Sequence, residues 1–337
     1  MTYVRTTVVG LFAAALLAQG ATDYKIQARY PIAGAGGWDY ITLDETARRL
    51  YVSHATQVEV LNADNGQFIG TIANTPGVHG IAIASVFKHG FTSNGKEDKV
   101  SVFDPSDLHL IKKIDVGKGP DGIYYDAASK RVFTNNHGSD DITAIDAEPL
   151  EVVGTVKVEG AGEQMVSGRD GLLYVNLEDK AEVVAFDAKS LAIRNRFPIG
   201  VAKTPTGLAF DPATNRLFIG CRNPQKLIVM STEDGKVLAD LPIGSGVDAT
   251  KYHGGHAFAS SGDGTLTVTG EKDGKIVVEQ VVATAAGART MGIDESTMTV
   301  YLPTAEMLPP APGAAQRRPQ PKPDSFMIVA VSQKAAQ

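Results

Sequence analysis

A chain of 337 residues, 43% of them hydrophobic, can bury a large core, so a wholly disordered protein is excluded. Its 32 lysines and arginines are slightly outnumbered by 38 aspartates and glutamates, which gives a formal net charge of −6. Because dedicated nucleic-acid binders carry a basic excess, this balance argues against nucleic acid as the partner. A small molecule or a protein partner remains open.

The first twenty residues have the pattern of a secretory signal peptide. Arg5 precedes a short apolar run, and a segment of small residues ends at Gly20. The run is too short to span a bilayer, so it predicts an exported protein rather than a membrane anchor. We therefore expect residues 1–20 to be removed before Ala21, a periplasmic or secreted location, and no transmembrane segment in the mature chain.

A short pattern with an aromatic residue in second place recurs about every forty residues. The seven aromatic residues are spaced by 40 to 44 positions: Tyr51, Phe91, Phe133, Tyr174, Phe218, Phe258 and Tyr301. Around each one, alternating apolar and polar residues separated by short polar turns predict four strands per unit. Units of four strands repeated radially predict an all-β, seven-bladed β-propeller, with these aromatic residues in its core.

The two ends of the chain are predicted to share one blade. The last unit supplies only three strands, the third of them at residues 326–332. The segment 29–34 matches the outer strands of other units, as at residues 196–200 and 240–244. We therefore expect this N-terminal strand to complete the seventh blade and to remove an exposed sheet edge. Residues 21–337 then form a single domain.

Three segments carry a family resemblance: Val-Phe-Thr-Asn-Asn at 132–136, Lys-Val-Ser-Val-Phe-Asp at 99–104, and Ile-Asp-Val-Gly-Lys-Gly-Pro-Asp-Gly at 114–122. They match the YVTN repeat, and the chain resembles the bacterial secreted YVTN-repeat β-propellers of the YncE-like group over essentially its whole mature length. The resemblance implies an exported propeller and leaves the activity open, because fold does not determine function.

The connectors that lead into the innermost strands reach the central channel of a propeller. Their third position is polar in all seven units: Asp39, His79, Asp121, Gln164, Thr206, Asp248 and Thr290. We expect these residues to ring one mouth of the channel. Four of them could hold a divalent metal ion, because carboxylates suit Ca²⁺ or Mg²⁺ and an imidazole admits Zn²⁺ or Mn²⁺. The four are Asp39, His79, Asp121 and Asp248. Hydrogen bonds between connectors, with no ligand, are the alternative.

Further candidate ligand-binding residues lie on the same predicted face. They are Trp38 and Arg289 on the connectors, and His54, Asn136, His137 and Arg222 on the loops between second and third strands. Trp38 could stack on a ligand, although packing in the channel wall is the stronger interpretation. His137 could bind a ligand or act as a base, and Arg222 could clamp a carboxylate or phosphate. An ordinary loop histidine and a solvated arginine are the alternatives.

The last unit contains a proline-rich insertion, residues 305–325, with a basic stretch at 317–323. This composition favours extended or disordered structure over a packed element. Its predicted place is the candidate face, where it would serve as a lid or a handle for a partner, or would be a tolerated loop.

The sequence favours a binding or scaffold protein that holds a small ligand or a protein partner at the channel mouth. It contains no linear catalytic motif of the common hydrolase, phosphate-binding or zinc-protease types. The alternative is a metal-dependent hydrolase or lyase, for instance lactonase-like, with Asp39, Asp121 and Asp248 as metal ligands. In that case His79 or His137 would act as acid or base. The sequence leaves the cofactor unknown, with a divalent metal ion as the possibility that the channel-mouth residues suggest.

Overall fold

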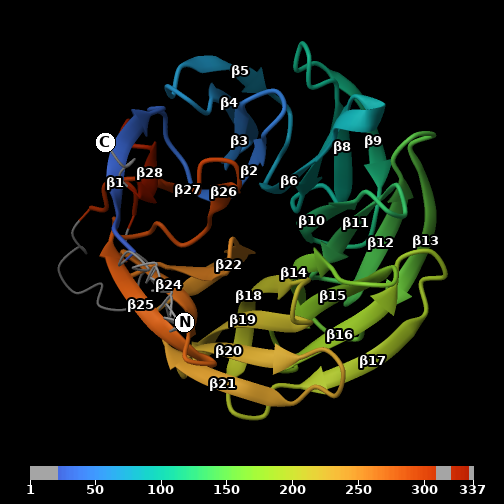
Figure 1. Ribbon diagram of the computed structural model, residues 1–337. Coiled ribbons are helices and arrows are strands. Elements are labelled where there is room, and N and C mark those ends of the chain that lie inside the picture. The colour runs from blue at the N-terminus through green and yellow to red at the C-terminus, as the bar shows by residue number, and fades with distance from the viewer. Residues whose placement is uncertain (1–21, 309–319, 334–337) are drawn as a thin grey trace, which may run out of the picture.

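The computed structural model describes residues 22–308 and 320–333. Their strands form seven antiparallel sheets of four strands, arranged radially around a central channel (Figure 1). This confirms the predicted seven-bladed, all-β propeller. The predicted signal peptide and residues 309–319 of the insertion lie outside the described residues. In the described ranges the one helical element is the 3₁₀ turn η1 (Ser85–Phe87), and no helix is long and apolar enough to cross a membrane.

Each blade runs from an inner strand at the channel to an outer strand at the rim (Figure 1). The inner strands are β2 (Trp38–Asp44), β6 (Val78–Ala84), β10 (Pro120–Asp126), β14 (Gly162–Ser167), β18 (Lys203–Asp211), β22 (Val247–His253) and β26 (Gly292–Asp294). The second strands are β3 (Arg49–His54), β7 (His89–Asn94), β11 (Arg131–Asn136), β15 (Leu172–Leu177), β19 (Arg216–Asn223), β23 (His256–Ser261) and β27 (Thr299–Thr304). The third strands are β4 (Gln57–Asn62), β8 (Lys99–Phe103), β12 (Asp141–Asp146), β16 (Glu182–Asp187), β20 (Gln225–Ser231), β24 (Thr265–Lys272) and β28 (Met327–Gln333). The outer strands are β5 (Phe68–Ile72), β9 (Leu110–Asp115), β13 (Glu151–Lys157), β17 (Ile193–Pro198), β21 (Val237–Pro242), β25 (Lys275–Ala283) and, from the other end of the chain, β1 (Tyr24–Pro31).

Blades are numbered here by their inner strands, from blade 1 at β2 to blade 7 at β26. Blade 7 is closed as predicted, because β1 lies beside β28, the blue and red strands of Figure 1. The two strands are antiparallel, with Tyr24 opposite Gln333 and Pro31 opposite Met327. The third strand of the last blade therefore has a partner, and the ring leaves no open sheet edge between its ends.

The core lies between neighbouring blades. All seven predicted anchors are at most 4% exposed: Tyr51, Phe91, Phe133, Tyr174, Phe218, Phe258 and Tyr301. Apolar clusters join residues of adjacent blades, for example Phe91 of blade 2 with Val132 of blade 3. A single blade would expose one of these faces to water, so burial of the apolar surface requires the complete ring.

A polar position of the repeat also links the blades. The side-chain amide of Asn135 in blade 3 donates a hydrogen bond to the carbonyl oxygen of Glu163 in blade 4, at 2.6 Å. The hydroxyl of Ser260 in blade 6 donates to the carbonyl oxygen of Arg289, just before the inner strand of blade 7, at 2.5 Å. These bonds fix the start of the next inner strand, where the predicted site residues lie.

The base of the predicted insertion is ordered by backbone pairing. Met307 forms an antiparallel bridge with Pro321, and the Lys322 N–H donates to the carbonyl oxygen of Glu306 at 2.7 Å. A further N–H bond runs from Asp324 to the carbonyl oxygen of Gly34, at 3.0 Å. The insertion is thus attached at its base to the segment that follows β1.

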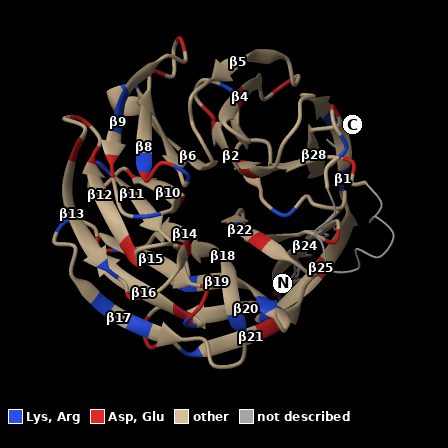
Figure 2. Cartoon of the chain, turned by 180° about the vertical axis from the view of Figure 1, so that it is seen from behind, with Lys and Arg blue, Asp and Glu red and all other residues tan. Residues whose placement is uncertain are grey.

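Charged residues of both signs are interspersed over the blades (Figure 2). Exposed pairs such as Lys25 with Asp23, at 2.9 Å, and Lys322 with Glu306, at 2.6 Å, contribute little to stability. The charged groups at the channel mouth are less exposed, from 6% for the side chain of Asp248 to 36% for that of His79.

Replacing Tyr24 with alanine should destabilise the whole ring. Its side chain is 2% exposed and meets the ring of Phe258 edge-on, with 5.4 Å between centroids. Loss of a buried aromatic side chain should lower the free energy of unfolding by about 3 kcal/mol. Urea denaturation would measure this, with Lys25→Ala on the same strand as the exposed control. Equal losses in both variants would contradict a closure that depends on β1.

Candidate functional site

The strand register brings the predicted connector residues to one mouth of the channel. In blades 1, 2 and 3 the first residue of the inner strand pairs with the last residue of the second strand, and the pairing then shifts by a β-bulge. The residue that follows the first pair is Asp39, His79 or Asp121. A bulge re-aims the side chain at which it occurs. Three of the predicted residues therefore occupy equivalent positions and meet one another.

In blade 4 the position belongs to Glu163, not to the predicted Gln164. Gly162 pairs with the end of the second strand, as Pro120 does in blade 3. Glu163 is therefore the equivalent of Asp121. The sequence alignment failed by one residue because it matched Gly162 to the glycine that precedes Pro120 in the other connector.

The neutral residues at the third connector position form hydrogen bonds with the backbone of neighbouring blades. The side-chain oxygen of Gln164 accepts a hydrogen bond from the N–H of Leu208 in blade 5, at 2.7 Å. The hydroxyls of Thr206 and Thr290 donate to carbonyl oxygens of the next blade, at 2.7 and 2.6 Å. For these three residues, the alternative given in the sequence analysis is correct: they form hydrogen bonds between connectors.

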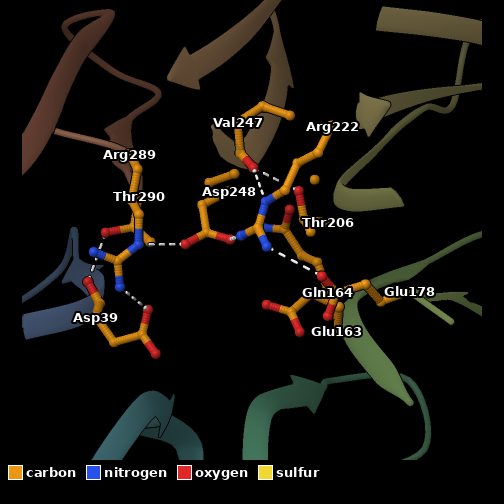
Figure 3. A network of polar contacts seen from close by, with 12 residues as sticks. Asp39, Glu163, Gln164, Glu178, Thr206, Arg222, Val247, Asp248, Arg289 and Thr290 are labelled. Carbon is orange, nitrogen blue, oxygen red and sulfur yellow. Dashed lines mark hydrogen bonds and ion pairs between the residues drawn. The ribbon is translucent and has the colours of Figure 1, made fainter. Parts of the chain in front are cut away.

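Partly buried charged groups of alternating sign continue around the mouth (Figure 3). Asp248 accepts from Arg289, with Nε 2.5 Å from Oδ2, and its other oxygen accepts from Arg222. Arg289 also reaches the carboxylate of Asp39, at 3.4 Å, and Arg222 reaches Glu178, at 3.1 Å. The sequence of charges Glu178, Arg222, Asp248, Arg289 and Asp39 thus crosses blades 4, 5, 6, 7 and 1.

His79 extends this sequence into blade 2. Its Nδ1 lies 2.7 Å from Oδ2 of Asp39 and 3.5 Å from Oδ1 of Asp121. Burial alone would lower the pKa of His79, but the hydrogen bond to Asp39 and the two carboxylate charges raise it to about 9. His79 therefore carries a positive charge at neutral pH, and the alternation continues to Asp121 in blade 3.

The alternation fails between blades 3 and 4, where two acids meet. Ligating atoms of Asp121, His137 and Glu163 all lie within 4.8 Å of one another. Burial raises the pKa of Asp121 to about 6, and the charge of Asp39 adds to this against the opposing charge of His79. Burial and the charges of nearby acids also raise the pKa of Glu163 well above its usual range. Oδ1 of Asp121 is buried without a hydrogen bond.

Two groups border this gap. The hydroxyl of Tyr40 donates to Oε1 of Glu163, at 3.0 Å, and fixes the orientation of that carboxyl. His137 is exposed and brings an imidazole from the loop between β11 and β12. Two carboxylates and an imidazole are the mixed oxygen and nitrogen ligands that a divalent transition metal accepts. Asp248 does not offer such a position, because arginines occupy both of its oxygens.

The channel beneath the mouth is narrow. Its cavity has a volume of about 60 Å³, and Tyr40, Glu163 and Gln164 are among its lining residues. Typical pockets for organic ligands start at about 300 Å³. The interior of the channel therefore suits an ion or a few water molecules.

Comparisons with known proteins give the family of this chain. The profile of the YNCE-like beta-propeller family matches residues 68–250, more than half of the sequence. The chain belongs to the YNCE-like β-propeller family. Among solved structures, this YNCE-like propeller is similar to hydrazine synthase of Kuenenia stuttgartiensis, with 15% sequence identity and a TM-score of 0.74. The similarity covers 93% of this chain and 99% of the other, and at this identity it shows the fold alone. A search of curated proteins found no match.

Three predicted site residues of this YNCE-like propeller lie outside the charged ring. Trp38 is 8% exposed and stacks on Phe326, with 5.5 Å between centroids, so it packs in the core. His54 is buried, with its Nδ1 3.5 Å from Oε1 of Glu59 in the next strand. Asn136 is buried and its amide donates within its own blade.

The two predicted arginines, Arg222 and Arg289, do lie in the charged ring, where they bind carboxylates of the protein itself.

Sequence reasoning missed three residues of the site: Tyr40, Glu163 and Glu178. An alignment that began the inner strand of blade 4 at Gly162 would have placed Glu163 at the position of Asp121. Glu178 follows the second strand of blade 4, in the same kind of loop as His137, and that equivalence was a usable signal. Tyr40 had no signal, because its contact with Glu163 crosses the channel from blade 1.

The proton held by His79 should make the stability of this propeller depend on pH. Its pKa rises from 6.5 to about 9 on folding, so its contribution is complete below pH 6.5 and is lost as pH rises through 9. In chelator-treated protein, His79→Gln should therefore have a lower melting temperature at pH 6 and approach the wild type above pH 9. Melting curves across this range would show it.

The matched control for that experiment is His109→Gln. His109 is exposed, and its Nδ1 lies 2.5 Å from Oδ1 of Asp107 in its own turn, far from the charged mouth. Its replacement should leave the pH profile of melting unchanged. A constant difference between His79→Gln and wild type at every pH would mean that His79 contributes packing rather than charge.

Proposed function

We propose that this propeller is a binding protein whose channel mouth captures one divalent cation between blades 3 and 4. Asp121, His137 and Glu163 are the proposed ligands. The family and fold support a general role as a binding scaffold. The observation that carries the proposal is the gap in the ring of alternating charges, where the carboxyls of Asp121 and Glu163 meet beside His137 and burial raises the pKa of both.

The electrostatic argument favours a cation over a neutral ligand. Two carboxylates in a desolvated site repel each other, so one of them holds a proton unless a positive charge compensates. The raised pKa values of Asp121 and Glu163 express this cost. A divalent ion would remove the repulsion, complete the alternation and release protons to the solvent.

The ligand set favours Zn²⁺ or Mn²⁺ among the ions considered. An imidazole nitrogen is a good ligand for these metals, whereas Ca²⁺ and Mg²⁺ prefer oxygen ligands throughout. His79 is left outside the set because Asp39 already binds it at 2.7 Å. Asp248 is left out because it is bound by two arginines.

The alternative function, a metal-dependent hydrolase or lyase, also begins with capture of a divalent cation at this gap. A bound cation at this gap would supply the Lewis acid that such chemistry requires, and His137 would then be one of its ligands rather than a free acid or base. Capture of the cation is therefore common to both hypotheses, and its measurement comes first.

Cation binding should stabilise the protein and depend on both acids. Chelator-stripped mature protein should bind about one Zn²⁺ or Mn²⁺ per chain by calorimetry, and its melting temperature should rise with metal concentration. Asp121→Asn and Glu163→Gln should each weaken binding by an order of magnitude or more, because each removes a carboxylate ligand.

Glu97→Gln is the control for these variants. It makes the same carboxyl-to-amide change on a loop of the same kind, where Glu97 pairs with Lys113 at 2.7 Å. Unchanged affinity in this variant is expected. The proposal fails if the wild type binds neither metal, or if Glu163→Gln binds as tightly as the wild type.

We also propose that the protein acts outside the cytoplasm, because its first twenty residues have the pattern of an export signal. In a bacterial host the processed protein should begin at Ala21 and appear in the periplasm or medium. N-terminal sequencing of the fractionated protein would measure this. A cytoplasmic protein that still begins at Met1 would contradict it.

A further inference from the structure

A second cavity lies on the face opposite the charged mouth. Its volume is about 400 Å³, and its walls come from the inner strands of blades 6, 7 and 1. Ile41, Leu43, Tyr252 and Ile293 give these walls apolar patches, and Thr42, Glu45, Lys251 and Glu295 make the rest of the lining polar. The inner strand of blade 7, β26, has only three residues, and its Gly292 and Ile293 line this cavity. The volume lies in the range of pockets that hold small organic molecules.

Lys251 is placed at the inner end of this cavity. It lies on β22, opposite Phe258 of the second strand, and is half-buried. It lines both the 400 Å³ cavity and the narrow 60 Å³ cavity under the mouth. Among residues 22–308 and 320–333, no hydrogen bond or ion pair holds its amine. A lysine directed into a cavity without a partner is costly to bury as a cation.

The acids near the cavity are engaged elsewhere. Oε1 of Glu45 accepts a hydrogen bond from the N–H of Glu295, at 2.6 Å, and Oε2 of Glu295 lies 3.2 Å from Nδ1 of His253. Burial lowers the pKa of Lys251, and the charge of Glu295 opposes this only in part. A larger share of the amine is therefore uncharged near neutral pH than for an exposed lysine.

We propose that Lys251 is a reactive amine that forms an imine with a neutral aldehyde bound in this cavity. The side chains of Ile41, Tyr252 and Ile293 would contact the body of the aldehyde. Glu45 and Glu295 line the same cavity and give it negative charge, which disfavours carbonyl compounds that carry a carboxylate. The 400 Å³ cavity opens on the other face and none of the proposed cation ligands lines it, although Lys251 and Glu163 both line the narrow 60 Å³ cavity.

The reaction balances without a further reactant. The lone pair of Nζ attacks the carbonyl carbon, a C–N bond forms, and the electrons of the C=O π bond move to oxygen. A proton passes from nitrogen to that oxygen to give a carbinolamine. Loss of one water molecule then leaves the C=N bond of the imine.

The test is reductive trapping of the mature protein with benzaldehyde and sodium cyanoborohydride at neutral pH, followed by peptide mapping. Each unit by which the pKa of an amine falls raises its uncharged fraction about tenfold at a pH below both values. Lys251 should therefore be modified at least several-fold faster than Lys275, an exposed lysine of the β24–β25 hairpin. Lys251→Met should lose this fast adduct, and Lys275→Met should keep it.

Glyoxylate in place of benzaldehyde tests the charge argument, and it should modify Lys251 more slowly. Competitive labelling of the wild type over a range of pH gives the same comparison without any variant, should Lys251→Met fail to fold. The proposal is overturned if Lys251 reacts no faster than Lys275. Equal rates with glyoxylate and benzaldehyde would overturn the preference for a neutral aldehyde.

Discussion

Antiparallel pairing of β1 with β28 is the interaction on which the other features of this propeller depend. It places the first blade beside the last, so Arg289 can reach Asp39 across a junction of residues 250 positions apart. The same junction brings Trp38 onto Phe326. Because the apolar core lies between blades rather than within them, an open ring would expose core surface and also separate the charged groups of the mouth.

The mouth shows how a propeller can bury charge. Inner strands, second strands and the loops beside them deliver charged side chains to a shared circle, and a charge is tolerated there when its neighbours have the opposite sign. Asp248 satisfies this condition twice, through Arg222 and Arg289. Asp121 satisfies it on one side only, through His79. The proposed cation site therefore lies where charges of the same sign meet, between Asp121 and Glu163, whereas charges alternate in sign around the rest of the circle.

The repeating parts of this structure were predictable from sequence, and the long-range side-chain contacts were not. The period of the aromatic residues gave the blades, and the likeness of residues 29–34 to other outer strands gave the closure, since both follow from local pattern. Glu163 was missed by one position because a connector differs in length, and period-based alignment cannot place a gap within one residue. The ion pair between Arg222 and Asp248 depends on the reach of a long side chain from blade 5 to the adjacent blade 6. Lys251 looked like any polar residue of an alternating strand.

Closure by the two chain ends also determines how the ring responds to force. The residue at the start of β1, Tyr24, lies opposite the residue at the end of β28, Gln333, so both ends leave the sheet at the same point. Tension applied to the two ends would load the first pair of backbone hydrogen bonds alone and then each pair in turn, as in opening a zipper. The ring, which is stabilised at equilibrium by apolar surface buried between all of its blades, is therefore mechanically weak when it is pulled by its two ends.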